Sequence, residues 1–216
     1  MTSTFEYVDQ LRDHWWWRPG WRAERHFYAC HFTFDDQPDL QRLVAEYQDP
    51  LREIRGLDLI PARWLHLTMQ GIGFVDEVEA NHVAALAAAA AEKLATVPAP
   101  VVTFHRPVIR SEAVYLPAQP ADGVHAVRSA VREAISEVLG ESGLEGTQSV
   151  SGYRPHVSLA YSNADQPAAP ILDALSQVDP EPVTITLRHV DLLEFHRDRR
   201  MYEWVSAQPL TIGAAF

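Results

Sequence analysis

Residues 64–70 have the sequence Trp-Leu-His-Leu-Thr-Met-Gln, in which every second residue is leucine or methionine. Successive side chains of a β-strand point to opposite faces, so this alternation predicts a strand whose leucines and methionine face the core. The other face then carries Trp64, His66, Thr68 and Gln70. The segment is therefore expected to place an imidazole beside a hydroxyl on one face of a sheet.

Residues 154–159, Arg-Pro-His-Val-Ser-Leu, repeat this arrangement in the second half of the chain. The same alternation puts Arg154, His156 and Ser158 on one face, and it sends Val157, Leu159 and Tyr161 toward the core. A single His-x-Thr tripeptide carries little information, because a histidine in a strand is usually a hydrogen-bonded structural residue. Two copies at equivalent places of two similar halves predict one shared site.

The paired motifs match the needs of phosphodiester cleavage. Opening a 2′,3′-cyclic phosphate requires one group to deprotonate the attacking water and another to protonate the leaving oxygen, and histidine can do either near neutral pH. We expect His66 and His156 to be this acid and base. The hydroxyls of Thr68 and Ser158 are expected to donate hydrogen bonds to the non-bridging phosphate oxygens. This chemistry demands no metal ion and no other cofactor.

Strands and helices alternate along the rest of the chain. Strands are expected over residues 25–34, 64–72, 101–106, 113–116, 153–161, 183–195 and 201–210, and helices over 38–54, 77–95, 122–140 and 171–178. Pro50 is expected to divide the first helix, Asp122 to cap the third, and Gly140 to end it before a loop through Gly143 and Gly146. The alternation lacks the uniform period of a parallel barrel, and several strands are close enough to pair as hairpins. We therefore expect an α+β fold, with two mainly antiparallel sheets facing a central cleft and helices outside.

The composition limits the class of protein. A net charge of −11 and a single lysine, Lys93, argue against a broad electrostatic footprint on nucleic acid. The single cysteine, Cys30, cannot form an internal disulfide, and there is no cysteine cluster for structural zinc. No apolar run approaches the ~18 residues of a membrane-spanning helix, and residues 1–10 lack the core of a signal peptide. We expect a cytoplasmic monomer that needs no membrane and no obligate protein partner.

The segments 60–68 and 153–160 resemble the two His-x-Thr/Ser motifs of the two-histidine (2H) phosphoesterase superfamily, specifically its bacterial 2′-5′ RNA ligase-like and cyclic phosphodiesterase branch. The resemblance extends from about Arg25 to the C-terminus. It implies a single bilobed, pseudo-twofold domain over residues 25–216, with both histidines in a central groove. It also implies metal-independent hydrolysis of a 2′,3′-cyclic phosphate or 2′-5′ phosphodiester on a nucleotide or RNA end.

Residues 1–24 have no counterpart in this resemblance and form a tryptophan-rich extension that contains His14-Trp15-Trp16-Trp17 and Trp21. The favoured interpretation is an arm that packs over an apolar surface. The alternative is a lid whose rings stack on a nucleobase.

Further candidates for the site come from strand position. Trp64 and Arg154 share the strand face of the histidines and are possible substrate contacts, while Tyr153, one residue out of phase, either flanks the groove or anchors the strand. The remaining histidines form no recognised metal pattern, and His26 and His31, five residues apart, are expected on opposite faces. The arginines at positions 197, 199 and 200 are interpreted as a solvated hairpin turn.

Two other functions would use the same residues. One is RNA 2′-5′ end joining, which differs only in substrate. The other is a non-catalytic nucleotide- or RNA-binding module of the same fold. The complete set of His66, Thr68, His156 and Ser158 favours an enzyme over a binding module.

Overall fold

The computed structural model describes residues 6–140 and 152–213. The expected loop through Gly143 and Gly146 lies outside these residues. The strands are β1 (Gln10–Leu11), β2 (Phe27–Thr33), β3 (Leu57–Leu59), β4 (His66–Phe74), β5 (Val101–Phe104), β6 (Val108–Ile109), β7 (Ala113–Pro117), β8 (His156–Ser162), β9 (Gln166–Pro167), β10 (Val183–Thr186), β11 (His189–His196) and β12 (Glu203–Thr211). The helices are α1 (Pro38–Gln48), α2 (Ala80–Leu94), α3 (Asp122–Leu139) and α4 (Ala169–Leu175), with short 3₁₀ helices η1 (Asp49–Leu51) and η2 (Ala62–Trp64).

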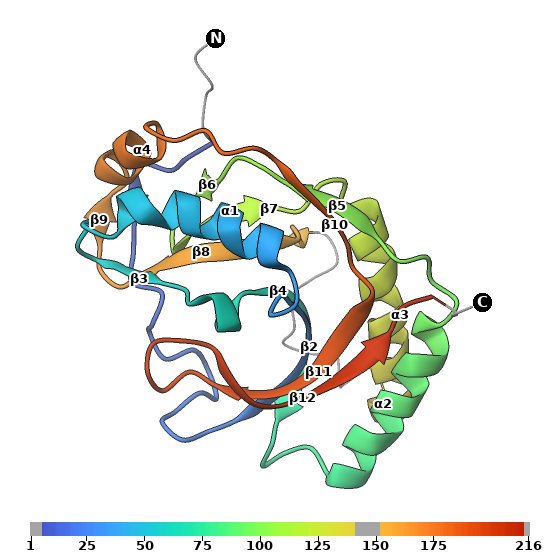
Figure 1. The fold of residues 1–216 in the computed structure, drawn as a ribbon. Helices are drawn as coiled ribbons and strands as arrows, with labels where there is room; N and C mark the ends of the chain where they lie inside the picture. Colours follow the sequence, from blue (N-terminus) through green and yellow to red (C-terminus); the bar gives the residue numbers. More distant parts are fainter. Residues whose placement is uncertain (1–5, 141–151, 214–216) are drawn as a thin grey trace.

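Two four-stranded antiparallel sheets form the frame of the molecule. One has the strand order β12-β11-β2-β4 and the other β3-β8-β7-β6, so the first motif lies on β4 and the second on β8. Figure 1 shows α2 and α3 side by side at one edge of the molecule, while α1 runs along β8. The α+β class, with antiparallel sheets and helices outside them, is confirmed.

Each motif strand contains a β-bulge directly after its hydroxyl residue. On β4 the pairing with β2 moves from Thr68 to Gln70, so Met69 is the extra residue. On β8 the pairing with β7 moves from Ser158 to Ala160, so Leu159 is the extra residue. A bulge reverses the inward and outward alternation for the residues that follow it.

The two bulges correct two expectations. Gln70 was expected beside His66, but its amide oxygen accepts a hydrogen bond from Arg132 of α3 at 2.9 Å, away from the motif face. Tyr161 is buried in the core as expected, but the bulge turns its ring to the side of β8 that carries Ser158, where it also lines the cavity. Strict period-two reasoning failed at both positions because neither bulge is marked by glycine or proline.

The carbonyl oxygens of the bulged residues, Met69 and Leu159, accept hydrogen bonds from buried side chains of α3 and α1. The Nε of Arg128 on α3 donates to the carbonyl of Met69 at 2.8 Å. The Nε2 of Gln48 on α1 donates to the carbonyl of Leu159, also at 2.8 Å. An unpaired buried carbonyl would cost roughly 1–3 kcal/mol, so these two bonds stabilise the bulges that shape the motif strands.

Several element boundaries differ from those expected. The first helix ends at Gln48 and a 3₁₀ turn follows through Pro50, which agrees with the expected division. Asp122 is the first residue of α3 and does not cap it, because Ala121 occupies the capping position; Gly140 ends the helix with a φ of 72°. The strand expected over 183–195 is two strands, β10 and β11, which pair with different neighbours.

The core is continuous between the two sheets and the helices. Its largest fully buried side chains include Tyr47 on α1, Phe32 on β2 and Phe104 on β5. In the part of the chain that the structure describes, no helix combines the length and the apolar character needed to cross a bilayer.

The N-terminal segment is attached along the edge of the second sheet. Its strand β1 pairs with β9, and the backbone nitrogens of Arg12 and His14 donate to the carbonyls of Ser111 (2.7 Å) and Ser162 (2.8 Å). Two of its tryptophans pack inward, and two, Trp16 and Trp17, are 47 % and 52 % exposed. The segment is therefore a fixed arm over residues 6–24, with two rings turned to solvent.

Arg197 anchors this arm and corrects the interpretation of the arginine turn. Its side chain is only 4 % exposed, its Nη2 donates to the carbonyl of His14 at 3.1 Å, and its guanidinium lies near the rings of Trp15, Trp21 and Tyr202. Arg199 instead pairs with Glu203 through two hydrogen bonds of 2.7 and 2.9 Å. Arg197 is a buried cation among aromatic rings, so the solvated interpretation was wrong for this residue.

Candidate active site

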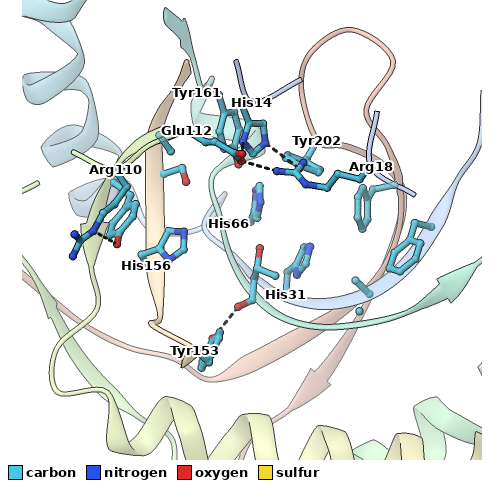
Figure 2. A pocket seen from close by; sticks show the side chains of 18 of the residues that line it. His14, Arg18, His31, His66, Arg110, Glu112, Tyr153, His156, Tyr161 and Tyr202 are labelled. Atoms are coloured by element: carbon cyan, nitrogen blue, oxygen red, sulfur yellow. Dashed lines mark hydrogen bonds and ion pairs between the residues drawn. The ribbon is translucent and has the colours of Figure 1, made fainter. Parts of the chain in front are cut away.

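The two motifs meet in one cavity between the sheets. The cavity has a volume of about 380 Å³, and His66, Thr68, His156 and Ser158 all line it. Figure 2 shows the imidazoles of His66 and His156 entering from the two separate strands, β4 and β8. A volume of this size suits a small ligand such as one nucleotide.

Both motif histidines are held by the same backbone hydrogen bond. The Nδ1 atom of His66 lies 2.8 Å from the carbonyl oxygen of Trp64, and Nδ1 of His156 lies 2.7 Å from the carbonyl oxygen of Arg154. A carbonyl oxygen can only accept, so Nδ1 carries the hydrogen in each ring. In the neutral state Nε2 is then a free base, and after protonation it becomes a donor.

An aromatic ring stacks on each motif histidine from the neighbouring strand. His31 on β2 lies opposite Thr68, and its ring is 5.1 Å from that of His66 at 19°. Tyr115 on β7 lies opposite Ser158, and its ring is 4.1 Å from that of His156 at 30°. The two halves of the site therefore share the register, the hydrogen bond and the stacked ring.

Burial keeps these histidines neutral near pH 7. It lowers the pKa of His66 from the usual 6.5 to about 4, an effect opposed by the hydrogen bond to Trp64 and strengthened by the charge of His156. Burial also lowers the pKa of His156, while its hydrogen bond to Arg154 raises it. The pKa of His31 falls to about 3 for the same leading reason, burial. The free site thus holds uncharged imidazoles.

These lowered pKa values predict an acid-shifted rate profile. Catalysis by an acid and a base needs one imidazole protonated and the other neutral, and above both pKa values the singly protonated fraction falls about tenfold per pH unit. We expect kcat/KM for a 2′,3′-cyclic nucleotide to reach its maximum below pH 6.5, the ordinary histidine pKa. Steady-state kinetics across pH would measure this profile.

Stability over the same range is the control for that profile. A histidine whose pKa is lowered by folding binds fewer protons when folded, so the folded state loses stability as pH falls from 6.5 toward 4. Thermal unfolding at each pH separates this loss from titration of the reaction. A kcat/KM maximum above about pH 7.5 in folded protein would contradict the role given to burial.

The two hydroxyl residues are held by tyrosines. Tyr153 donates its hydroxyl to the carbonyl oxygen of Thr68 at 2.8 Å, and its ring lines the cavity. Tyr161 shares a side-chain hydrogen bond with Ser158, and burial raises the pKa of this tyrosine. Tyr153 thus lines the cavity, and its hydrogen bond also connects the residues before β8 to β4. It therefore has both of the expected roles, flanking the groove and anchoring the strand.

Trp64 and Arg154 lie elsewhere. Trp64 belongs to η2, so its expected strand position is wrong, and its ring packs edge-on against Trp204 with centroids 4.6 Å apart. Arg154 precedes β8, is exposed, and lines a neighbouring cavity of about 340 Å³ together with Arg110 and Tyr153. Neither is among the described residues that line the cavity of the histidines. Their substrate contacts stay predictions.

The N-terminal arm, Glu112 before β7 and Tyr202 before β12 complete the wall of the cavity near His66. His14 stacks on Tyr161 with centroids 4.1 Å apart, and its Nε2 is 3.0 Å from the Tyr202 hydroxyl. Burial lowers the pKa of His14 to about 2. The Arg18 guanidinium binds Glu112 at 2.7 Å. His14, Arg18 and Glu112 all line the cavity. Figure 2 shows this group on one side of the site.

Sequence reasoning missed His31, Tyr115, His14, Arg18 and Tyr202. His31 and Tyr115 lie on strands without a motif and reach the cavity through cross-strand register. His14 and Arg18 reach it through packing of the arm, and Tyr202 reaches it from the turn between β11 and β12. The one available signal was the position of His31 on the predicted strand 25–34, which pairs with the first motif strand. His26 lies just before the observed strand β2 and pairs with Glu194 at 2.6 Å.

The donors in the cavity suit proton transfer better than metal binding. Within residues 6–140 and 152–213, no group of three or more histidine, cysteine or acidic side chains is placed to hold a metal ion. The carboxylate that lines the cavity, Glu112, is already bound by Arg12 and Arg18 at 2.8 and 2.7 Å. An oxygen-rich site for a divalent cation would need carboxylates free of such partners.

Comparisons with known proteins agree with this architecture. Residues 34–199 match the sequence model of the 2′-5′ RNA ligase superfamily. No curated protein matches the chain. Among solved structures, TT0787 of Thermus thermophilus superposes with a TM-score of 0.59 and 21 % identity, over 86 % of this chain and 97 % of that one. LigT of E. coli in apo form superposes with a TM-score of 0.58 and 17 % identity, over 88 % and 99 %. At these identities the superpositions establish a shared fold.

Proposed function

Because the chain belongs to the 2′-5′ RNA ligase superfamily, we propose that it is a phosphoesterase that acts on a 2′,3′-cyclic phosphate or a 2′-5′ phosphodiester of a nucleotide or RNA end. One observation carries this proposal. Two neutral imidazoles with the same tautomer, each two residues before a hydroxyl on its strand, line a single cavity of nucleotide size.

The proposed reaction moves two protons. For a cyclic phosphate, Nε2 of His156 takes a proton from water as the water oxygen bonds to phosphorus. The bond from phosphorus to one ribose oxygen breaks, and Nε2–H of His66 protonates that oxygen. His156 ends protonated and His66 neutral, and exchange with solvent resets them. Burial lowers the pKa of both histidines, so each imidazolium is a stronger acid than a histidine in water.

The hydroxyls of Thr68 and Ser158 would bind the non-bridging oxygens. Charge on these oxygens increases as phosphorus becomes five-coordinate, so fixed donors there stabilise the transition state more than the substrate. Tyr153 fixes the backbone at Thr68, and Tyr161 bonds to the side chain of Ser158, so both residues are held in place. The structural neighbours add support for ligand size, since LigT of E. coli has been crystallised in complex with 3′-AMP, ATP and phosphate.

We also propose that residues 25–216 act as one bilobed domain and that the chain works as a cytoplasmic monomer without a metal ion. The absence of a metal requirement follows from the donor set, in which imidazoles and hydroxyls face the cavity and the lining carboxylate is bound by arginine.

The test is hydrolysis of a panel of 2′,3′-cyclic nucleotides and 2′-5′ linked dinucleotides in the presence of EDTA. We expect turnover of at least one class, with the rate unchanged by the chelator, because both proton transfers use side chains of the protein. Product analysis by chromatography gives the bond that was cleaved. Complete loss in EDTA with recovery on adding one metal ion would overturn the acid-base assignment. Tight nucleotide binding without turnover of any substrate would favour the binding module, and joining of RNA ends without hydrolysis would favour the ligase.

A further inference from the structure

The N-terminal arm contributes to the cavity from residues that precede the family match. That match begins at residue 34, whereas His14 and Arg18 line the cavity from outside it. The arm is fixed there by β1, by the backbone bonds of Arg12 and His14, and by the buried Arg197. Its position is thus part of the folded structure, and its side chains face the site in a defined geometry.

The charge balance around the cavity favours one of its two arginines as an anion-binding group. Arg110 is paired with Glu6, a balance of one cation to one anion. Glu112 is shared by Arg12 and Arg18, so two cations surround one carboxylate. This pair therefore leaves one positive charge in excess beside the cavity. Arg12 is 64 % exposed in its side chain and Arg18 29 %, and of the two only Arg18 is among the lining residues described.

Arg18 is also oriented toward the half of the site that holds His66. Its Nη2 is 2.7 Å from Glu112 and its Nη1 is 3.3 Å from the hydroxyl of Tyr202. The Tyr202 ring in turn lies edge-on to His66, with centroids 5.7 Å apart. A guanidinium has five N–H donors, and the hydrogen bonds shown use one from each of two nitrogens. The remaining donors can bind an anion while the ion pair holds the group in place.

We propose that Arg18 binds the substrate phosphate, and that the N-terminal arm is therefore part of the active site. This inference rests on the proposed function. A phosphodiester carries one negative charge and its five-coordinate transition state carries more, while the hydroxyls of Thr68 and Ser158 supply only neutral donors to the non-bridging oxygens. Arg18 supplies a fixed positive charge that these hydroxyls lack.

The experiment compares Arg18→Gln with Arg12→Gln, two variants that each remove one cation from the same carboxylate. Their kcat/KM for a 2′,3′-cyclic nucleotide and their affinity for inorganic phosphate would be measured, the latter by calorimetry. Loss of a charge-assisted hydrogen bond predicts a fall of about 10- to 100-fold for Arg18→Gln in kcat/KM, with weaker phosphate binding. Arg12→Gln should stay within about threefold of wild type, because an exposed ion pair contributes little.

The double variant R18Q/E112Q separates phosphate binding from simple neutralisation of Glu112. If Arg18 binds phosphate, the double variant stays as impaired as Arg18→Gln, whereas recovery to the wild-type rate would overturn the inference. Equal effects of Arg12→Gln and Arg18→Gln, or wild-type phosphate affinity in Arg18→Gln, would also overturn it. Thermal unfolding of each variant identifies any loss that comes from misfolding.

Measuring phosphate affinity as well as turnover tests the role of Arg18 separately from the proposed phosphoesterase activity. A wild-type protein that binds phosphate but cleaves no diester would refute the proposed function, and the Arg18 variants would still decide the anion site through affinity. A wild-type protein that cleaves a diester while Arg18→Gln retains full activity would refute the inference alone.

Discussion

Replacing His156 or His66 with alanine is expected to lower kcat for a verified substrate by about 10²- to 10⁴-fold, because each variant removes one proton-transfer group. The fold should persist, since both side chains face the cavity and the hydrogen bond that each ring makes is to a carbonyl two residues earlier in the chain. Steady-state kinetics with the wild type and both variants would measure the effect, and circular dichroism would check the fold.

The double variant His66→Ala, His156→Ala tests whether the histidines act as a unit. Groups that share one reaction step give non-additive losses, so the double variant should be little slower than the slower single variant. His105→Ala is the matched control, because this imidazole interacts with Asp179 at 4.0 Å and is not among the residues described as lining the cavity. Wild-type turnover in either motif variant would refute paired acid-base catalysis and would favour a binding module.

The second large effect is expected at the hydroxyls. Thr68→Val and Ser158→Ala each remove one donor to the phosphate, which should cost roughly 2–4 kcal/mol of transition-state stabilisation. The loss should fall mainly on kcat, because charge on the oxygens grows after substrate binding. Thr68→Ser keeps the donor and should retain most of the activity.

Ser158 needs a separate control because it also bonds to Tyr161. Tyr161→Phe removes that bond while the Ser158 hydroxyl remains. If Ser158 donates to phosphate, Ser158→Ala should be slowed much more than Tyr161→Phe. Equal losses in the two variants would assign Ser158 to holding Tyr161, and the phosphate contact would then be wrong for this half of the site.

The sequence predicted the elements of the site better than their surroundings. The repeat of His-x-Thr and His-x-Ser on alternating strands was enough to predict a shared cavity, since side-chain parity holds up to the hydroxyl residue of each motif. Beyond that residue the bulges at Met69 and Leu159 reversed the parity, and Gln70 and Tyr161 moved to unexpected sides. The bulges depend on hydrogen bonds from Arg128 and Gln48, which are distant in sequence and give no local signal.

The rings that stack on the motif histidines from neighbouring strands could not be predicted from the sequence. His31 and Tyr115 stack on the motif histidines because of the register of β2 with β4 and of β7 with β8. Register depends on tertiary pairing, which alternation within one strand cannot reveal. The arm was expected to pack over an apolar surface, and Trp15 and Trp21 do so. The placement of His14 and Arg18 in the cavity arises from the same packing and required the structure.

The near equivalence of the two histidines has a consequence for the direction of the reaction. Each ring makes the same Nδ1 hydrogen bond and presents the same nitrogen, so either can give or take the proton. By microscopic reversibility, the residue that protonates a leaving oxygen in cleavage deprotonates the same oxygen in the reverse reaction. A site of this kind accelerates bond breaking and bond formation by the same factor. Joining a ribose hydroxyl to a cyclic phosphate and cleaving the resulting 2′-5′ bond are then the two directions of one catalysed equilibrium, whereas water in place of the ribose hydroxyl leads to hydrolysis.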